Sequence, residues 1–100
     1  MAEKKQHQKR EELYDTILSL SSNQECIDFF RDLCTVKELE ALEQRYEVAR
    51  MLEMDNVYLD IMQKTGASSA TISRVKRMLS DGTGVLGKKI RAALSEEKIS

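Results

Sequence analysis

The side chains best suited to binding chemistry lie between residues 64 and 77, where small hydroxyl groups are followed by cations. Short side chains let a helix approach the edges of DNA bases, and Lys or Arg beyond them can neutralise phosphates. This order predicts contact with a major groove, with Ser69, Ala70 and Ser73 facing bases and the cations near phosphates. The residues predicted to contact DNA are Lys64, Ser68, Ser69, Ala70, Thr71, Ser73, Lys76 and Arg77.

Residues 58–77 have the layout of a helix-turn-helix motif, in which a short helix, a turn with a glycine and a second helix follow one another. Gly66 lies in the turn, where a left-handed backbone costs little only for a residue without a β-carbon. Apolar Ile61, Ile72 and Val75 can lock the two helices together. The alternative interpretation of the same pattern is an ordinary helical hairpin with a solvated basic face.

Charge is divided unevenly along the chain, although the formal net charge is only -1. Residues 1–63 carry 8 Lys/Arg against 14 Asp/Glu, a balance of -6, and residues 64–94 carry 7 against 1, a balance of +6. A polyanion would bind to the basic block. The leading hypothesis is therefore a sequence-specific DNA-binding regulator. The same asymmetry also permits a helical protein-interaction module that docks on an acidic protein partner.

Enzymatic and metal-binding classes find little support in the composition. The single histidine, His7, lies in a charged arm without metal ligands at suitable spacing, and no phosphate-binding glycine loop or paired nucleophile and base is present. Cys26 and Cys34 would be roughly 12 Å apart on one helix, beyond disulfide reach, so we expect reduced thiols. We expect a protein that is not an enzyme and holds no metal.

The chain also lacks the signals of membrane insertion and secretion. No apolar run approaches the roughly 18 residues of a membrane span, and the N-terminus is charged without an apolar secretion core. We therefore expect a cytoplasmic protein without a membrane partner.

Six helices account for the hydrophobic pattern, and the absence of proline leaves them uninterrupted. Two sequence pairs, Ser22 with Glu25 and Thr35 with Glu38, have the form of capping boxes that open the second and third helices. The expected spans are residues 3–21, a helix after Ser22, Thr35 to about Met54, a short helix capped by Asp55 or Asn56, Ser68 to about Leu79, and residues 85–94 with a frayed tail. This is a single all-α domain whose small size limits its own core.

Each of the longer expected helices carries an apolar stripe at three- and four-residue spacing, which should face inward. The inward positions are Leu13, Ile17 and Leu20; Cys26, Phe29, Phe30 and Leu33; Leu39, Leu42, Tyr46 and Ala49; Ile72, Val75 and Leu79; and Leu86, Ile90 and Leu94.

Two blocks of the chain resemble the Trp repressor family in content, order and spacing. TVKELEALEQR, residues 35–45, is similar to the segment that opens the family's long central helix, and TGASSATISR, residues 65–74, is similar to the family's helix-turn-helix. The six-helix count agrees with the family's architecture. The resemblance points in particular to the Trp repressor-related proteins of the YerC/YecD type.

The resemblance implies an intertwined homodimer that binds double-stranded DNA, as a repressor, at a twofold-symmetric operator. Helices one, two, three and six of both chains would build a shared dimerisation core from residues 1–55 and 85–95. Helices four and five, within residues 56–80, would form each helix-turn-helix. Two such motifs should meet half-sites one helical turn apart, about 34 to 36 Å between centres.

The resemblance also implies a pocket for a small-molecule corepressor. In the family a pair of arginines brackets the corepressor, and the matching positions are Arg45 and Arg74, with Thr35 at the position of a pocket-lining threonine. An arginine can hold a carboxylate through two parallel hydrogen bonds. The residues themselves leave alternatives open, because Arg45 lies on a largely apolar helix face where a structural ion pair is favoured, and Arg74 could equally contact phosphate.

The chain departs from the family at this pocket. Val75 follows the second arginine, where Trp repressors have a glycine that leaves room for the indole ring, and Met78 replaces a small polar residue one turn later. A valine should fill the space that the ring needs. We therefore expect a corepressor other than tryptophan, or no cofactor at all.

Overall fold

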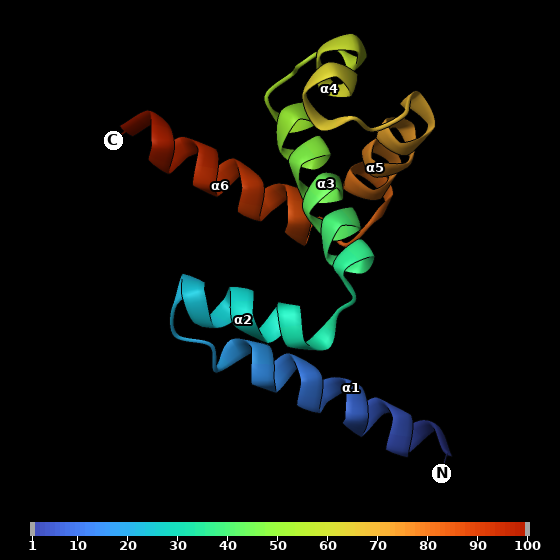
Figure 1. Ribbon diagram of the computed structural model, residues 1–100, viewed down its shortest axis with the longest axis vertical. Coiled ribbons are helices and arrows are strands. Elements are labelled where there is room, and N and C mark those ends of the chain that lie inside the picture. Colours follow the sequence, from blue (N-terminus) through green and yellow to red (C-terminus); the bar gives the residue numbers. More distant parts are fainter. Residues whose placement is uncertain (1, 100) are drawn as a thin grey trace. The chain divides into compact units, whose positions relative to one another are not determined.

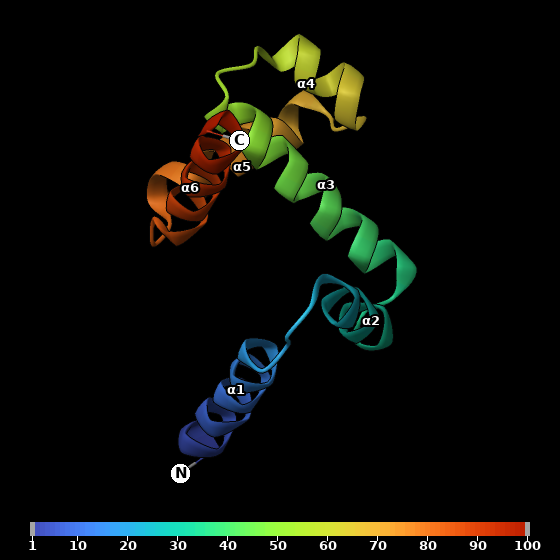
Figure 2. The ribbon, with the colours of Figure 1, turned by 90° about the vertical axis from the view of Figure 1, so that its left-hand side faces the viewer.

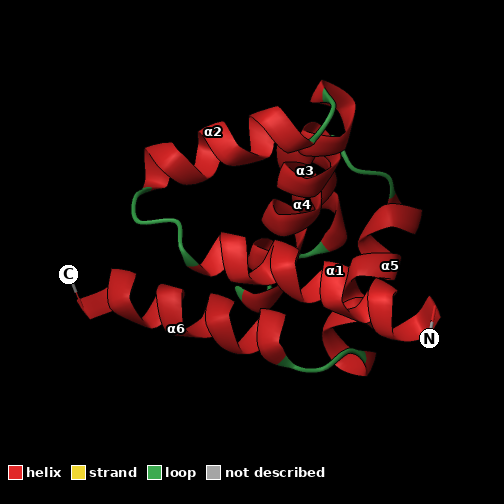
Figure 3. Cartoon of the chain, turned by 90° about the horizontal axis from the view of Figure 1, so that it is seen from below, coloured by secondary structure: helices red, strands yellow, loops and turns green. Residues whose placement is uncertain are grey.

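The computed structural model describes residues 2–99, and side chains from residue 10 to residue 97. Within that range the chain forms helices joined by loops and no strand (Figure 3), which confirms the all-α class. The helices are α1 (Ala2–Leu18), α2 (Asn23–Leu33), α3 (Val36–Glu53), α4 (Tyr58–Thr65), α5 (Ser69–Asp81) and α6 (Val85–Ile99).

Side-chain caps fix the starts of α2 and α3 where the sequence predicts them. The hydroxyl of Ser22 accepts the Glu25 N–H at 3.0 Å, although the Glu25 carboxylate accepts from the N–H of Ser21 at 2.9 Å rather than from Ser22. The box at α3 is complete: Thr35 Oγ1 accepts the Glu38 N–H at 3.1 Å, and Glu38 Oε1 accepts the Thr35 N–H at 2.8 Å. The Thr35 backbone N–H, and after it the Thr35 side chain, lowers the pKa of Glu38.

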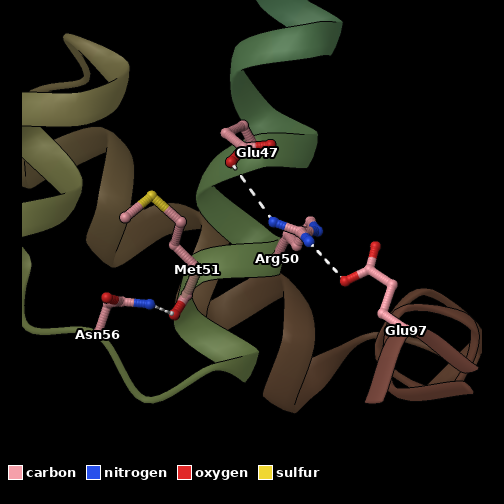
Figure 4. Close-up of polar contacts among 5 residues, drawn as sticks. All are labelled: Glu47, Arg50, Met51, Asn56 and Glu97. Atoms are coloured by element: carbon pink, nitrogen blue, oxygen red, sulfur yellow. Dashed lines mark hydrogen bonds and ion pairs between the residues drawn. The ribbon is translucent and has the colours of Figure 1, made fainter. Parts of the chain in front are cut away.

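The connection between α3 and α4 differs from the prediction, because Asp55 and Asn56 end one helix instead of starting the next. Asp55 has a left-handed φ of 60°, and Asn56 Nδ2 donates to the carbonyl of Met51 at 3.1 Å (Figure 4). The N-cap of α4 is Val57, which offers no side-chain acceptor. Asparagine and aspartate tolerate the left-handed conformation and bond to nearby backbone, so the same residue types serve either helix end.

The chain divides into two compact units, Met1–Leu39 and Glu40–Ser100, with the division falling inside the unbroken helix α3 (Figure 2). The second unit, which we call the C-terminal unit, has a closed apolar core drawn from α3, α4, α5 and α6. Its buried residues are Val48, Ala49, Met51, Ile61, Ala67, Ile72, Val75 and Ile90, with Leu52, Tyr58, Leu79 and Leu94 packed against them. The inward stripe expected for α5 is confirmed.

Helix α6 is attached to α3 by ion pairs as well as by Ile90. Arg50 lies 2.9 Å from Glu97 and 3.9 Å from Glu47 (Figure 4), and Arg91 lies 3.1 Å from Glu53. The expectation of a frayed tail from residue 95 is therefore wrong, because α6 continues to Ile99 and its last turns are paired with α3.

The first unit, which we call the N-terminal unit, leaves its apolar side chains largely uncovered. Leu18 is 82% exposed, Leu33 56% and Val36 74%, and no residue of α2 is buried. The rings of Phe29 and Phe30 meet edge to face with their centroids 5.3 Å apart, but both remain only half-buried. The inward faces predicted for α1 and α2 are thus not buried within the chain itself, since two helices alone bury too little surface to enclose a core.

The stripe predicted for α3 is buried only along its second half. Ala49 belongs to the closed core, whereas Leu42 and Tyr46 are exposed. In α6 the expectation holds for Ile90 and Leu94, but Leu86 is exposed.

Candidate DNA-binding surface

Helices α4 and α5 pack against each other around a glycine turn (Figure 1). Gly66 has the predicted left-handed backbone, with φ at 74°, and its N–H donates to the carbonyl of Met62 at 2.9 Å. Thr65 Oγ1 donates to Ile61 at 2.7 Å and accepts the N–H of Ala67 at 3.1 Å. The turn therefore has both a conformation and a set of hydrogen bonds that hold α4 and α5 in one geometry.

A contact with α3 fixes this turn from the other side. Gln44 Nε2 donates to the carbonyl of Thr65 at 3.0 Å, so the last carbonyl of α4 is satisfied by a neighbouring helix. A β-carbon at Gly66 would still find space, because the nearest atom is 4.0 Å away. The glycine is required by the backbone angle and not by crowding.

The outward face of α5 and its N-cap carry most of the residues predicted to contact DNA, while Lys64 lies on α4. Ile72 and Val75 are buried and Leu79 is half-buried, so these three positions fix how the helix is rotated. The exposed residues of the predicted set are Lys64, Ser68, Ser69, Ala70, Ser73, Lys76 and Arg77, whereas Thr71 is half-buried.

Two of the predicted hydroxyl residues are occupied in capping the helix. Ser68 is the N-cap of α5, as predicted, and its Oγ accepts the Thr71 N–H at 3.2 Å. The two hydroxyls lie 3.1 Å apart. Ser68 and Thr71 therefore hold the start of α5, while Ser69 and Ala70 remain available at its exposed edge.

The cations of this surface are available to a ligand. We call Lys64, Arg74, Lys76 and Arg77 the basic surface; all four are exposed. None of them forms an ion pair with another residue whose side chain is described. Their positive charge is consequently not neutralised by any side chain between residues 10 and 97.

The three residues predicted to bind a corepressor fall in both units. Thr35 belongs to the N-terminal unit and uses its hydroxyl to cap α3, whereas Arg45 and Arg74 belong to the C-terminal unit and are exposed. Arg45 makes no ion pair with any residue from 10 to 97, so the structural ion pair favoured for it is not formed there. Val75 is buried in the core and Met78 is exposed.

Sequence reasoning missed a hollow beside α5 and one residue at its edge. A hollow of about 680 Å³ opens where the end of α3, the start of α4 and the second half of α5 meet. It is lined by Leu52, Glu53, Asp55, Asn56, Val57, Tyr58, Lys76, Leu79 and Ser80. The missed residue is Tyr58, whose hydroxyl receives a hydrogen bond from Ser73 Oγ at 3.5 Å. An aromatic residue at the first position of a predicted helix was the available signal.

The described residues include neither a membrane-spanning helix nor a candidate metal centre. No helix there is long and apolar enough to cross a membrane. No group of three or more His, Cys, Asp or Glu side chains is arranged to hold a metal ion.

Comparisons with known proteins place this geometry in a family. The sequence model for the Trp repressor protein matches residues 8–94. YerC, an uncharacterized protein of Bacillus subtilis (strain 168), is 56% identical over 72 residues, which are 72% of this chain and 69% of YerC. The solved structure of a TrpR-like protein from Eubacterium eligens is 48% identical with a TM-score of 0.82, covering 86% of this chain and 89% of that one.

A second solved structure agrees with the first. A candidate Trp repressor from Staphylococcus aureus is 44% identical with a TM-score of 0.75, and the match covers 90% of this chain and 86% of that one. The family match spans both units and includes the turn at Gly66 and the basic surface. The chain belongs to the Trp repressor family.

Proposed function

We propose that this protein is a sequence-specific DNA-binding transcription regulator, a repressor that acts in the cytoplasm. The observation that supports it most is the exposed face of α5, where small side chains and unpaired cations stand opposite the buried Ile72 and Val75. Such a face fits a major groove, because its cations can bind phosphates while short side chains approach the bases. Membership of the Trp repressor family supports the same function.

A homodimer is part of the proposal. The N-terminal unit exposes Leu18, Leu33 and Val36, and a second copy of the chain would remove such apolar surface from water. In an intertwined dimer built from residues 1–55 and 85–95, the two helix-turn-helix segments within residues 56–80 would face one side of a duplex. The operator is then twofold symmetric, with half-site centres about 34 to 36 Å apart.

Regulation by a small molecule other than tryptophan is also proposed, with Thr35, Arg45 and Arg74 as the residues that would hold it. Exposed, unpaired Arg45 and Arg74 are suited to bind a carboxylate. Val75 argues against tryptophan, since its side chain occupies the position where the family has a glycine. Isothermal titration with tryptophan should show no site-binding heat, and a micromolar dissociation constant would contradict this part of the proposal.

Selection of duplexes from a random pool tests the main proposal. The wild-type protein should enrich a dyad-symmetric sequence, and its affinity for that sequence should exceed its affinity for random DNA by about a thousandfold or more. Binding without preference among duplexes would favour the alternative, a module that docks on an acidic protein.

A double variant tests the assignment of the surface. Lys76→Ala with Arg77→Ala should weaken binding to every duplex and reduce the dependence of affinity on salt, because fewer counterions are released. Lys88→Ala with Lys89→Ala is the comparison, since it removes the same charge from exposed positions of α6 that belong to the basic block but not to the predicted DNA contacts. Equal effects of the two double variants would show that only overall charge matters.

A further inference from the structure

Tyr58 combines a fixed ring with a hydroxyl at the surface. It is the first residue of α4, and its ring packs against the apolar core of the C-terminal unit. Its hydroxyl lies 3.5 Å from Ser73 Oγ on α5. That distance is long for a bond between hydroxyls, which are usually about 2.7 to 2.8 Å apart. The phenol therefore keeps its donor for a ligand while its position is held by packing.

Lys76 lies beside this pair. It follows Ser73 by three residues, so both project from neighbouring positions on one side of α5. Tyr58 and Lys76 also line the same hollow. Two hydroxyls and one ammonium group from two helices are thus gathered at one exposed edge, and Lys76 has no ion-pair partner among the described side chains.

The carboxylates on the rim of the hollow do not cancel this positive edge. Glu53 is ion-paired with Arg91 at 3.1 Å, and its side chain is 16% exposed. Asp55 is exposed to solvent, where water and salt screen its charge. A small anion at the Tyr58 edge would therefore meet donors and one uncompensated cation.

We propose that Tyr58, Ser73 and Lys76 bind one backbone phosphate of DNA, with the Tyr58 hydroxyl and the Lys76 ammonium donating to phosphate oxygens. This inference rests on the proposed function and names a contact within it. Ser73 Oγ, 3.5 Å from the phenol oxygen, then lies between the bases and the backbone. Because the ring is anchored on the core, the phosphate fixes the position of α4 and α5 together along the duplex.

The test compares Tyr58→Phe with the wild-type protein on a mixed-sequence duplex of about 30 base pairs, long enough for two half-sites. The variant should bind about tenfold more weakly, since a hydrogen bond to a charged phosphate is lost. The loss should be the same for unrelated sequences, and the salt dependence should stay unchanged because the phenol carries no charge. Lys76→Ala should instead reduce the salt dependence.

Two controls separate contact from folding. Tyr14→Phe makes the same change at an exposed position of α1 and should leave affinity unaltered. The thermal midpoint of Tyr58→Phe should match that of the wild type. A lowered midpoint with affinity restored on cooling would mean that the hydroxyl only supports the fold, which would overturn the inference.

Neutral methylphosphonate linkages, placed one at a time in the duplex selected by the wild-type protein, give a second measurement. One position should weaken the wild type strongly and Tyr58→Phe much less, because the variant has already lost that contact. The phosphate contact is refuted if Tyr58→Phe binds DNA as tightly as the wild type does. It is also refuted if each methylphosphonate linkage lowers the affinity of the variant as much as that of the wild type. In both cases DNA binding itself stands. If the wild type binds no duplex, the proposed function itself fails.

Discussion

The two units of this chain are stabilised in different ways. Among its described side chains the C-terminal unit encloses eight buried apolar residues, whereas the N-terminal unit relies on local bonds such as the helix caps at Ser22 and Thr35. Several of its apolar side chains, including Leu18 and Val36, are exposed to solvent. A region with caps but without a core has helices whose apolar faces need another surface, while a region with a core can hold a binding face rigidly by itself.

The largest expected effect comes from breaking the core of the C-terminal unit. Ile72→Ala should lower the free energy of unfolding by about 2 to 5 kcal/mol, because it leaves a cavity between α5 and its neighbours. Leu59→Ala, at a position that is 63% exposed in α4, should change it by less than about 0.5 kcal/mol. Urea denaturation followed by circular dichroism measures both. Similar losses would mean that Ile72 does not lie in a closed core of the C-terminal unit.

The N-terminal unit should respond through association. In the proposed dimer, Leu33→Gln should raise the dissociation constant at least about tenfold, because a polar group would replace apolar surface that the second copy would cover. Arg31→Gln introduces the same side chain nearby on α2 and should change it little. Sedimentation over a concentration series gives both constants. An unchanged dimer dissociation constant for Leu33→Gln would show that this apolar surface takes no part in dimerisation.

The turn between α4 and α5 should be sensitive to backbone angle alone. Gly66→Ala should destabilise the protein by about 1 to 2 kcal/mol, since φ at 74° is unfavourable for a residue with a β-carbon. Gly66→Asn should lose less, because asparagine adopts this conformation more readily. Thermal unfolding of both variants measures which one loses more stability. An equal loss of stability would point to crowding by the β-carbon instead of the backbone angle.

The smallest effect concerns the cap of α3. The pKa of Glu38 is lowered in the folded chain, so its contribution to stability is present above the unfolded pKa and is lost as the pH falls through the folded pKa. Thr35→Val keeps the backbone N–H, which lowers the pKa most, and removes the hydroxyl, so it should raise this pKa only part of the way toward the ordinary value. A carboxyl titration by NMR measures the shift, and an unchanged pKa would contradict the capping geometry.

Local signals account for the part of the fold that could be predicted from sequence. Ser22, Thr35 and Ser68 cap the helices that they precede, and Gly66 adopts the left-handed turn, because these effects depend on residues within one helical turn. The predicted N-cap of α4 is wrong because Asp55 and Asn56 suit both the end of one helix and the start of another.

Contacts that depend on packing could not be predicted in the same way. The role of Tyr58 was not predicted from the sequence, because its hydroxyl contacts Ser73 only when α4 and α5 pack together. The apolar stripe of α2 was expected inside, but periodicity identifies a face that avoids water and does not say which chain covers it. The corepressor residues Thr35, Arg45 and Arg74 would likewise meet only through packing, so their shared role stays a prediction.

Sedimentation of the protein with and without its selected duplex tests the central claim most directly. The account predicts a species of twice the 11.5 kDa chain mass in free solution and two chains on each duplex that contains one dyad. A chain that stays monomeric at micromolar concentration and binds selected and random duplexes alike would contradict it.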